Sequence, residues 1–194
     1  MSPNNSYQIV TVRALEELEH YLANGLWEVY QQAFGDYPWY EIWTEEDVDL
    51  IMKEYFLFRD SKVDVAMDKD KAVGLGARHP LEFDAEVAEH LRKVLDVPTT
   101  MYMADVAVFP ANQKQGWGTR LVNSSFVCLP AWCTGMVMRT AKEGSKSEQI
   151  FARCNFKHVD VPDMQVESLR LDGIRKSDPR VFMYCRADDI CFAS

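Results

Sequence analysis

The chain has 194 residues, of which 47% are hydrophobic, and its formal net charge is −9. This length fits one domain, so we expect a single domain over residues 1–194 with a well-buried core. No apolar run reaches membrane-spanning length, and the first residues lack the basic and apolar regions of a signal peptide. The five cysteines are odd in number and lack C-x-x-C spacing, so we expect reduced thiols and a cytoplasmic protein.

The charge is unevenly distributed along the chain. Residues 1–112 carry 9 basic and 21 acidic side chains, whereas residues 113–157 carry 7 basic and 2 acidic ones. A basic segment in an acidic chain favours a small polyanion at that segment and a cationic partner elsewhere, although solvated charge without a ligand is the alternative. The acidic bulk would repel a long phosphate backbone, which disfavours nucleic-acid binding.

Alternation, helical spacing and capping signals predict the elements of the N-terminal half. Thr44 precedes three acidic residues, which is typical of a helix start, and a charged turn at residues 68–71 joins two apolar runs. In chain order we expect a strand at Tyr7–Arg13, a helix at Ala14–Phe34, a helix from Thr44 to about Arg59, a hairpin at Val63–Met67 and Ala72–Arg78, and a helix at Leu81–Leu95.

The C-terminal half continues this alternation of strands and helices. We expect a central strand at Thr99–Phe109, a helix at Gly116–Leu129, a strand at Thr134–Thr140, a helix at Ser145–Cys154, and strands at Phe156–Val161 and Arg180–Arg186. This order predicts an α/β (α+β) fold, in which helices cover both faces of a mixed sheet.

The most informative segment follows the central strand. After a break at Pro110, residues 113–118 read Gln-Lys-Gln-Gly-Trp-Gly and open a helix. The glycines let an anion approach backbone N–H groups that have no intrahelical acceptor, and the helix dipole adds positive charge there. Lys114 and Arg120 add full charges, so the segment predicts a pyrophosphate cradle beside a strand with a free edge.

Two motifs resemble the GNAT superfamily of acetyl-CoA-dependent N-acetyltransferases. Gln113, Gly116 and Gly118 meet the pattern Arg/Gln-x-x-Gly-x-Gly/Ala. Residues 138–140 end a strand, and residues 150–156, Ile-Phe-Ala-Arg-Cys-Asn-Phe, are similar to the family's Leu-Tyr-x-x-x-Gly-Phe. The resemblance implies a mostly antiparallel central sheet with a V-shaped opening after the central strand. A dinucleotide site fits less well, because the glycines come late and no acidic residue follows at the expected distance.

The resemblance also implies a binding mode for acetyl-CoA. The backbone of the central strand, at Val106, Ala107 and Val108, would pair with the pantetheine amides. The pyrophosphate would lie on the N–H groups of Gln115, Gly116, Trp117, Gly118 and Thr119, with Gln113 and Lys114 closing over it. The Trp117 side chain itself is expected to pack in the core, and stacking on the cofactor is the alternative.

Two residues of the central strand are candidates for the acid–base chemistry. Amine attack on a thioester requires a group that removes a proton from the ammonium. Asp105 is the only acidic residue of this strand, but strict alternation would point it away from the face of Tyr102. Relatives carry a β-bulge here that can redirect the strand, so both Asp105 and Tyr102 stay candidates.

The general acid is not identified by the resemblance. Relatives often have a Tyr that protonates the thiolate where this chain has Phe151, and Asn155 replaces the family glycine. A water or a nearby hydroxyl, such as that of Tyr184 or Ser147, could serve because a thiol of pKa about 8.5 leaves readily as thiolate.

The loop over residues 34–43 is expected to border the acceptor pocket, as in similar proteins. It holds five aromatic residues and two carboxylates, and Trp39, Tyr40 and Glu41 are the candidates for binding an ammonium group. A packed corner is the alternative. The four histidines show no ligand spacing, so we expect no metal.

The sequence therefore predicts a cytoplasmic acyltransferase that moves an acetyl group from acetyl-CoA to a primary amine of a small cationic molecule or peptide. A non-catalytic acyl-CoA-binding sensor or degenerate relative is the alternative, favoured by Phe151. We expect no nucleic-acid or membrane partner, and a homodimer is left open. The sequence does not name the acceptor or the acyl chain preference.

Overall fold

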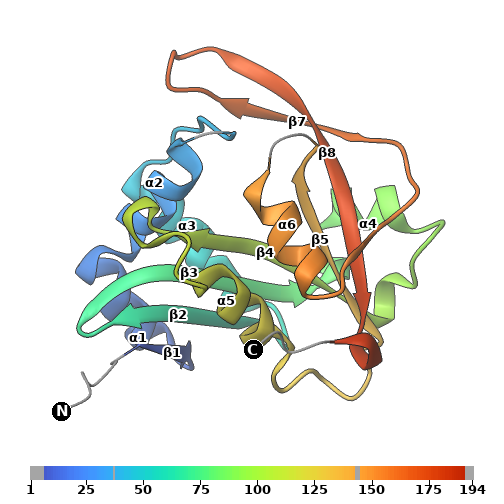
Figure 1. Cartoon of the computed structure of the whole chain (residues 1–194), viewed down its shortest axis with the longest axis horizontal. Coiled ribbons are helices and arrows are strands. Elements are labelled where there is room, and N and C mark those ends of the chain that lie inside the picture. Colours follow the sequence, from blue (N-terminus) through green and yellow to red (C-terminus); the bar gives the residue numbers. More distant parts are fainter. Residues whose placement is uncertain (1–6, 37, 143–144, 191–194) are drawn as a thin grey trace.

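A computed structural model describes residues 7–36, 38–142 and 145–190. These residues form an eight-stranded sheet in the order β1-β2-β3-β4-β5-β8-β6, with β7 also paired to β8 (Figure 1). The strands are β1 (Tyr7–Val12), β2 (Lys62–Asp68), β3 (Lys71–Pro80), β4 (Thr100–Val108), β5 (Gly135–Ala141), β6 (Lys157–His158), β7 (Met164–Leu169) and β8 (Arg175–Arg186). The pair β4–β5 is parallel and the other strand pairs are antiparallel, which confirms the predicted mixed, mostly antiparallel sheet.

Helices cover both faces of the sheet, as predicted (Figure 1). They are α1 (Leu15–Tyr21), α2 (Trp27–Gly35), α3 (Glu45–Glu54), α4 (Ala85–Leu91), α5 (Trp117–Phe126) and α6 (Lys146–Arg153), with a π-helical segment at Leu22–Leu26. Short 3₁₀ turns lie at Tyr55–Leu57, Leu81–Phe83, Val97–Thr99, Pro110–Asn112 and Ala187–Asp189. The apolar side chains of α1–α4 pack on one face, and those of α5 and α6 pack on the other.

Three predicted elements are corrected by the structure. The helix expected at Ala14–Phe34 is broken at Gly25, whose φ of +94° is left-handed. The strand expected at Phe156–Val161 is only Lys157–His158, because the chain turns where the Val161 N–H donates to the Val159 carbonyl. The last strand begins at Arg175 rather than Arg180, and its partner β7 was not predicted.

The sheet opens between β4 and β5. Their pairing runs from Thr100↔Gly135 to Met103↔Met138 and goes no further, although β4 continues to Val108 and β5 to Ala141. Beyond this fork the β5-facing edge of β4 has no strand beside it among the described residues. This is the V-shaped opening that the resemblance implied.

A β-bulge in β4 lies at the same fork. Met103 pairs with Arg78 and Asp105 pairs with Ala77, so Ala104 is an extra residue without a partner on β3. Strict alternation therefore fails at this position. Asp105 turns toward the face covered by α2 and α3, and Tyr102 packs on the same face beside α4.

Candidate active site

A cavity of about 350 Å³ lies at the start of α5, between β4 and α6. Lys114, Lys146 and Arg153 line it, and the described lining includes no acidic residue. Gly116 caps α5 with a φ of +86°, and the Arg120 N–H is bonded to the Gly116 carbonyl at 3.1 Å. The N–H groups that precede Arg120 have no acceptor within the helix, so cationic side chains and helix N–H groups converge on one hollow suited to a phosphate.

Most of the residues predicted to bind the cofactor line this cavity: Val106, Val108, Gln113, Lys114, Gly116, Trp117, Gly118 and Thr119. Ala107 and Gln115 are not part of its lining. The Ala107 side chain is buried on the opposite face of the sheet, and the exposed Gln115 side chain folds back toward the Ala111 carbonyl, 3.5 Å away.

The two conspicuous residues of the glycine motif have structural roles. The Trp117 side chain is 2% exposed and packs beside Leu121, so its side chain belongs to the core. A Cβ on Gly118 would lie 2.8 Å from Cδ1 of Ile150, so this glycine permits the close contact between α5 and α6.

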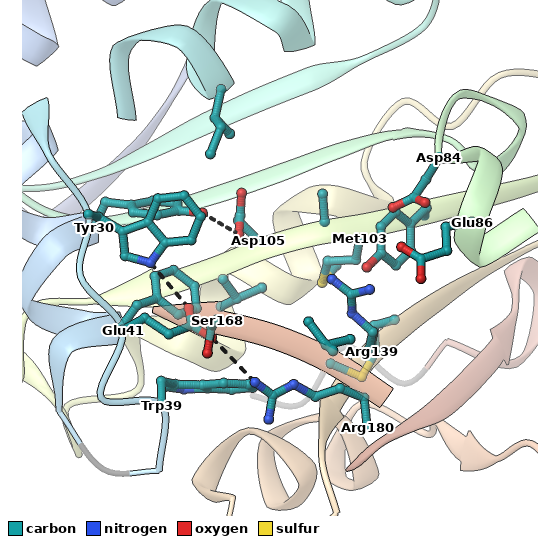
Figure 2. Close-up of a pocket in the computed structure, with 18 of the residues that line it drawn as sticks. Tyr30, Trp39, Glu41, Asp84, Glu86, Met103, Asp105, Arg139, Ser168 and Arg180 are labelled. Atoms are coloured by element: carbon teal, nitrogen blue, oxygen red, sulfur yellow. Dashed lines mark hydrogen bonds and ion pairs between the residues drawn. The ribbon is translucent and has the colours of Figure 1, made fainter. Parts of the chain in front are cut away.

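A second cavity of about 710 Å³ opens on the face covered by α2, α3 and α4 (Figure 2). It is enclosed by the bulged part of β4, the end of β5, and the β7–β8 pair. The two cavities share four lining residues: Phe34, Trp39, Val106 and Ser147. A ligand reaching along the β4 edge from the first cavity would therefore meet a ligand in the second.

Asp105 lies in the second cavity and is buried. The Tyr30 hydroxyl donates to its Oδ1 at 3.2 Å, and the Tyr55 hydroxyl donates to its Oδ2 (Figure 2 draws the Tyr30 bond). Burial raises the pKa of Asp105 to about 6, while the hydrogen bonds from the two tyrosines and the charge of Arg139 limit that rise. The carboxylate is therefore ionised at neutral pH but basic enough for proton transfer.

Tyr102 lines the same cavity, but its hydroxyl is protonated at neutral pH and does not serve as the base. Burial raises the pKa of its hydroxyl to about 12. The neighbouring His79 ring, 5.5 Å away between centroids, donates from Nδ1 to the Pro80 carbonyl at 2.9 Å, because a carbonyl only accepts. Its Nε2 is then an acceptor, and burial lowers the pKa of the ring.

Of the loop residues predicted to bind the acceptor, Trp39 and Glu41 line the second cavity and Tyr40 does not. Glu41 accepts from Arg180 at 3.3 Å and from Trp43 at 3.1 Å, and the Arg180 guanidinium lies 4.5 Å from the Trp39 ring centroid (Figure 2). Both Trp39 and Glu41 line the cavity but already contact a cation of the protein. Tyr40 is 45% exposed and outside the lining, and Tyr37 of the same loop lies outside the described residues.

The two hydroxyls considered for the general acid, those of Ser147 and Tyr184, lie in different parts of the structure. Ser147 lines both cavities, and its Oγ is 2.6 Å from the Thr140 Oγ1. Tyr184 lies at the other end of β5, beside Gly135, and lines neither cavity. Phe151, the replacement for the family Tyr, is buried at the wall of the second cavity and has no proton to donate.

Three residues of the site were missed by the sequence analysis. Tyr30 and Tyr55 lie within two of the predicted helices but were not singled out, and nothing local in the sequence pairs them with Asp105. Arg139 was noted only as part of a strand end, although a charge inside the apolar run 135–141 was a usable signal.

The comparisons with known proteins agree with this geometry. The model of the Acetyltransferase (GNAT) family matches residues 23–156. The chain belongs to this family. As a GNAT acetyltransferase it is an acyltransferase that uses acetyl-CoA, which confirms the class of enzyme that the sequence predicted.

Solved structures similar to this GNAT chain share its fold at low identity. The Salmonella typhimurium protein yncA, solved with its cofactor acetyl-CoA, has 15% identity and a TM-score of 0.65, over 95% of this chain and 96% of its own. The ribosomal-protein-S18-alanine N-acetyltransferase from Escherichia coli has 11% identity and a TM-score of 0.61, over 93% of this chain and 94% of its own. A comparison with curated proteins gave no match.

Within the described ranges, no helix has both the length and the apolar composition needed to cross a bilayer. The same residues contain no group of three or more His, Cys, Asp or Glu side chains placed to hold a metal ion.

Proposed function

We propose that the protein transfers the acetyl group of acetyl-CoA to a primary amine by direct attack of the amine on the thioester. One observation carries the proposal: a basic cavity of about 350 Å³ and a carboxylate-bearing cavity meet at the β4–β5 fork, where they share Val106 and Ser147. The pyrophosphate lies at the start of α5, and the pantetheine runs along the unpaired edge of β4 toward the fork.

Asp105 receives the proton that the amine must lose. An amine arrives as an ammonium ion, and the acidic side chains of the second cavity favour that form. They are Glu54, Asp84, Glu86, Asp105 and Glu167, together with Glu41, which is paired with Arg180. Because an ammonium nitrogen has no lone pair, it first loses a proton to Asp105, directly or through one water, and the neutral amine then attacks the carbonyl carbon. The nitrogen gives up its second proton as the C–S bond breaks, and the thiolate leaves as CoA thiol. Tyr102 and His79 border this position and can orient that water.

Ser147 assists departure of the thiolate. Its hydroxyl is the one among the described candidates that lines both cavities, and its bond with Thr140 fixes its position. A hydrogen bond from Ser147 to the sulfur compensates for the missing Tyr at position 151, since a thiolate needs only modest stabilisation to leave.

The test compares binding with turnover. Titration calorimetry with acetyl-CoA measures the first cavity, and release of free CoA thiol in the presence of a panel of amines measures both cavities together. We expect binding and amine-dependent thiol release. Binding without thiol release from any amine would instead identify a non-catalytic acyl-CoA sensor.

A further inference from the structure

Arg139 is placed at the fork of the sheet by the register of β5. Met138 makes the last pair with β4, so Arg139 is the first residue of β5 beyond the pairing. It lies opposite Phe182 of β8, on the face that also carries Tyr102 and Asp105. Figure 2 shows its guanidinium pointing into the second cavity, between the start of α4 and Arg180.

The Arg139 guanidinium has no ionic partner among the described residues. Its one hydrogen-bond contact there is with the Met164 sulfur, 3.8 Å from Nη1, which is a weak acceptor. The other two buried arginines beside the cavity are paired, Arg180 with Glu41 and Arg170 with Asp178, whereas Arg175 of the same lining is exposed. A guanidinium has five N–H donors, so most of those of Arg139 are free for a ligand.

The charges around Arg139 keep it ionised without contacting it. Burial lowers its pKa, but Tyr102, Asp84, Glu86 and Asp105 raise the pKa by more. Asp84 is committed to capping α4, where its Oδ1 accepts from the Val87 N–H at 3.0 Å. In addition, the buried Oγ of Ser168 on the cavity wall lacks a hydrogen-bond partner within the described residues.

The cavity therefore presents a carboxylate and a free guanidinium on one face, at the point where the acetyl group arrives. A planar guanidinium matches a carboxylate through two parallel hydrogen bonds, and this match is strong in an enclosed site. Resting on the function proposed above, we propose that the acceptor is an amino acid or a similar zwitterion. Its amine lies at Asp105, and Arg139 binds its anionic group.

Matched acceptors test this inference directly. Thiol release is measured with L-amino acids, with the primary amine left when each carboxylate is removed, and with the corresponding aminophosphonates. We expect kcat/KM for the best amino acid to exceed that of its matched amine by at least about tenfold. A higher kcat/KM for an aminophosphonate would also support the anion site and identify a phosphonate as its ligand.

The variant Arg139→Gln removes the charge and keeps a polar side chain. It should lower kcat/KM for the amino acid about 30-fold, equivalent to about 2 kcal/mol at 1.4 kcal/mol per tenfold, and change that of the amine less than about threefold. The ratio is measured in one preparation, so partial misfolding cancels. Arg139→Lys should give an intermediate ratio, and Arg92→Gln, at the exposed residue that follows α4, is the matched surface control.

Two results would count against the inference in different ways. Equal or better turnover of the amines, or an unchanged ratio in Arg139→Gln, overturns the anion site and leaves the acetyltransferase proposal intact. Absence of thiol release with every acceptor, while acetyl-CoA still binds, overturns the proposed function and the acceptor class with it.

Discussion

At Asp105, two tyrosine hydroxyls donate hydrogen bonds to a carboxylate that burial would otherwise keep protonated. The balance leaves its pKa at about 6, near the range in which a general base works best at neutral pH. Tyr30 and Tyr55 come from different helical segments, so the protonation of one strand residue depends on how α2 and the turn after α3 pack against β4.

The first prediction concerns the pH dependence of turnover. Activity should rise with pH through about 6, because Asp105 must be ionised to accept a proton. Tyr55→Phe removes a hydrogen bond that lowers the pKa of Asp105, so the acidic limb of the profile should move to higher pH. Asp105→Asn should lower kcat by about 10²-fold with acetyl-CoA affinity unchanged. Profiles of kcat/KM against pH check these shifts, and full activity of Asp105→Asn would remove Asp105 from the mechanism.

The second prediction concerns stability at the same residue. The pKa of Asp105 is higher in the folded protein than its reference value of 3.8, so its contribution to stability is present below about pH 4 and is lost as pH rises through about 6. Asn cannot ionise, so Asp105→Asn should be more stable than the wild type at pH 8, by up to about 3 kcal/mol, and the gain should vanish near pH 4.

Denaturant unfolding at the two pH values measures this difference. Asp70→Asn, at an exposed turn residue between β2 and β3, controls for the loss of a carboxylate. A lower stability of Asp105→Asn at pH 8 would contradict the expected cost of the buried charge.

At the scale of the element, the start of α5 supports a third prediction. Nothing lies within 4 Å of a Cβ built on Gly116, so a side chain there has space but must adopt a left-handed backbone. Asn and Asp both tolerate that conformation and have the same shape. Gly116→Asp should therefore bind acetyl-CoA at least about tenfold more weakly than Gly116→Asn, since only the aspartate places a negative charge at the pyrophosphate. Equal affinities in calorimetry would mean that the phosphates bind elsewhere.

The elements also mark what a sequence can and cannot reveal. The glycine motif and the strand before it were readable because the signals are local: caps, glycines and alternation. The strand β7 has the alternating pattern Met-Gln-Val-Glu-Ser-Leu but was overlooked, and Pro179 inside β8 obscured the start of that strand. The face toward which Asp105 points could not be predicted from the sequence, because a bulge depends on the register with β3 and not on β4 alone.

In the candidate site, too, local signals could be recognised in the sequence, whereas contacts between distant segments could not. Asp105 was singled out as the only acid of its strand, whereas its two tyrosines lie 75 and 50 residues away along the chain. The contacts of Glu41 and Trp39 with Arg180 could not be predicted for the same reason, since Arg180 is 139 residues from Glu41. Local chemistry can be predicted from sequence, but pairing between distant segments requires the fold.

At the scale of the molecule, the loop after α2 is joined to the β7–β8 pair beside the second cavity. The Ile42 N–H donates to the Leu169 carbonyl and the Leu171 N–H donates to the Tyr40 carbonyl, each at 3.0 Å. The same two segments are joined by the ion pair between Glu41 and Arg180, whose side chains are 11% and 4% exposed. The N-terminal and C-terminal parts of the chain therefore build one wall of the site together.

The fourth prediction tests this junction. Glu41→Gln leaves the Arg180 guanidinium buried without its carboxylate, so it should destabilise the fold by about 3 kcal/mol. Replacing both partners, as in Glu41→Gln with Arg180→Met, should recover part of the loss because no buried charge remains unpaired. Denaturant unfolding of the single and double variants measures the coupling. A single variant as stable as the wild type would show that the pair contributes nothing.

The extra residue in β4 determines what a one-residue deletion would do to this strand. Side chains of a strand alternate with odd and even position, and Ala104 interrupts that parity once, between Met103 and Asp105. Deleting Ala104 would restore a continuous ladder with β3 while every other side chain of β4 kept its present face. The bulge has two effects: it sets the face toward which the Asp105 carboxylate points, and it bends β4 away from β5. The deletion would separate these two effects. Loss of cofactor binding with Asp105 still against its tyrosines would then show that the strand's bend, rather than its side chains, holds the thioester.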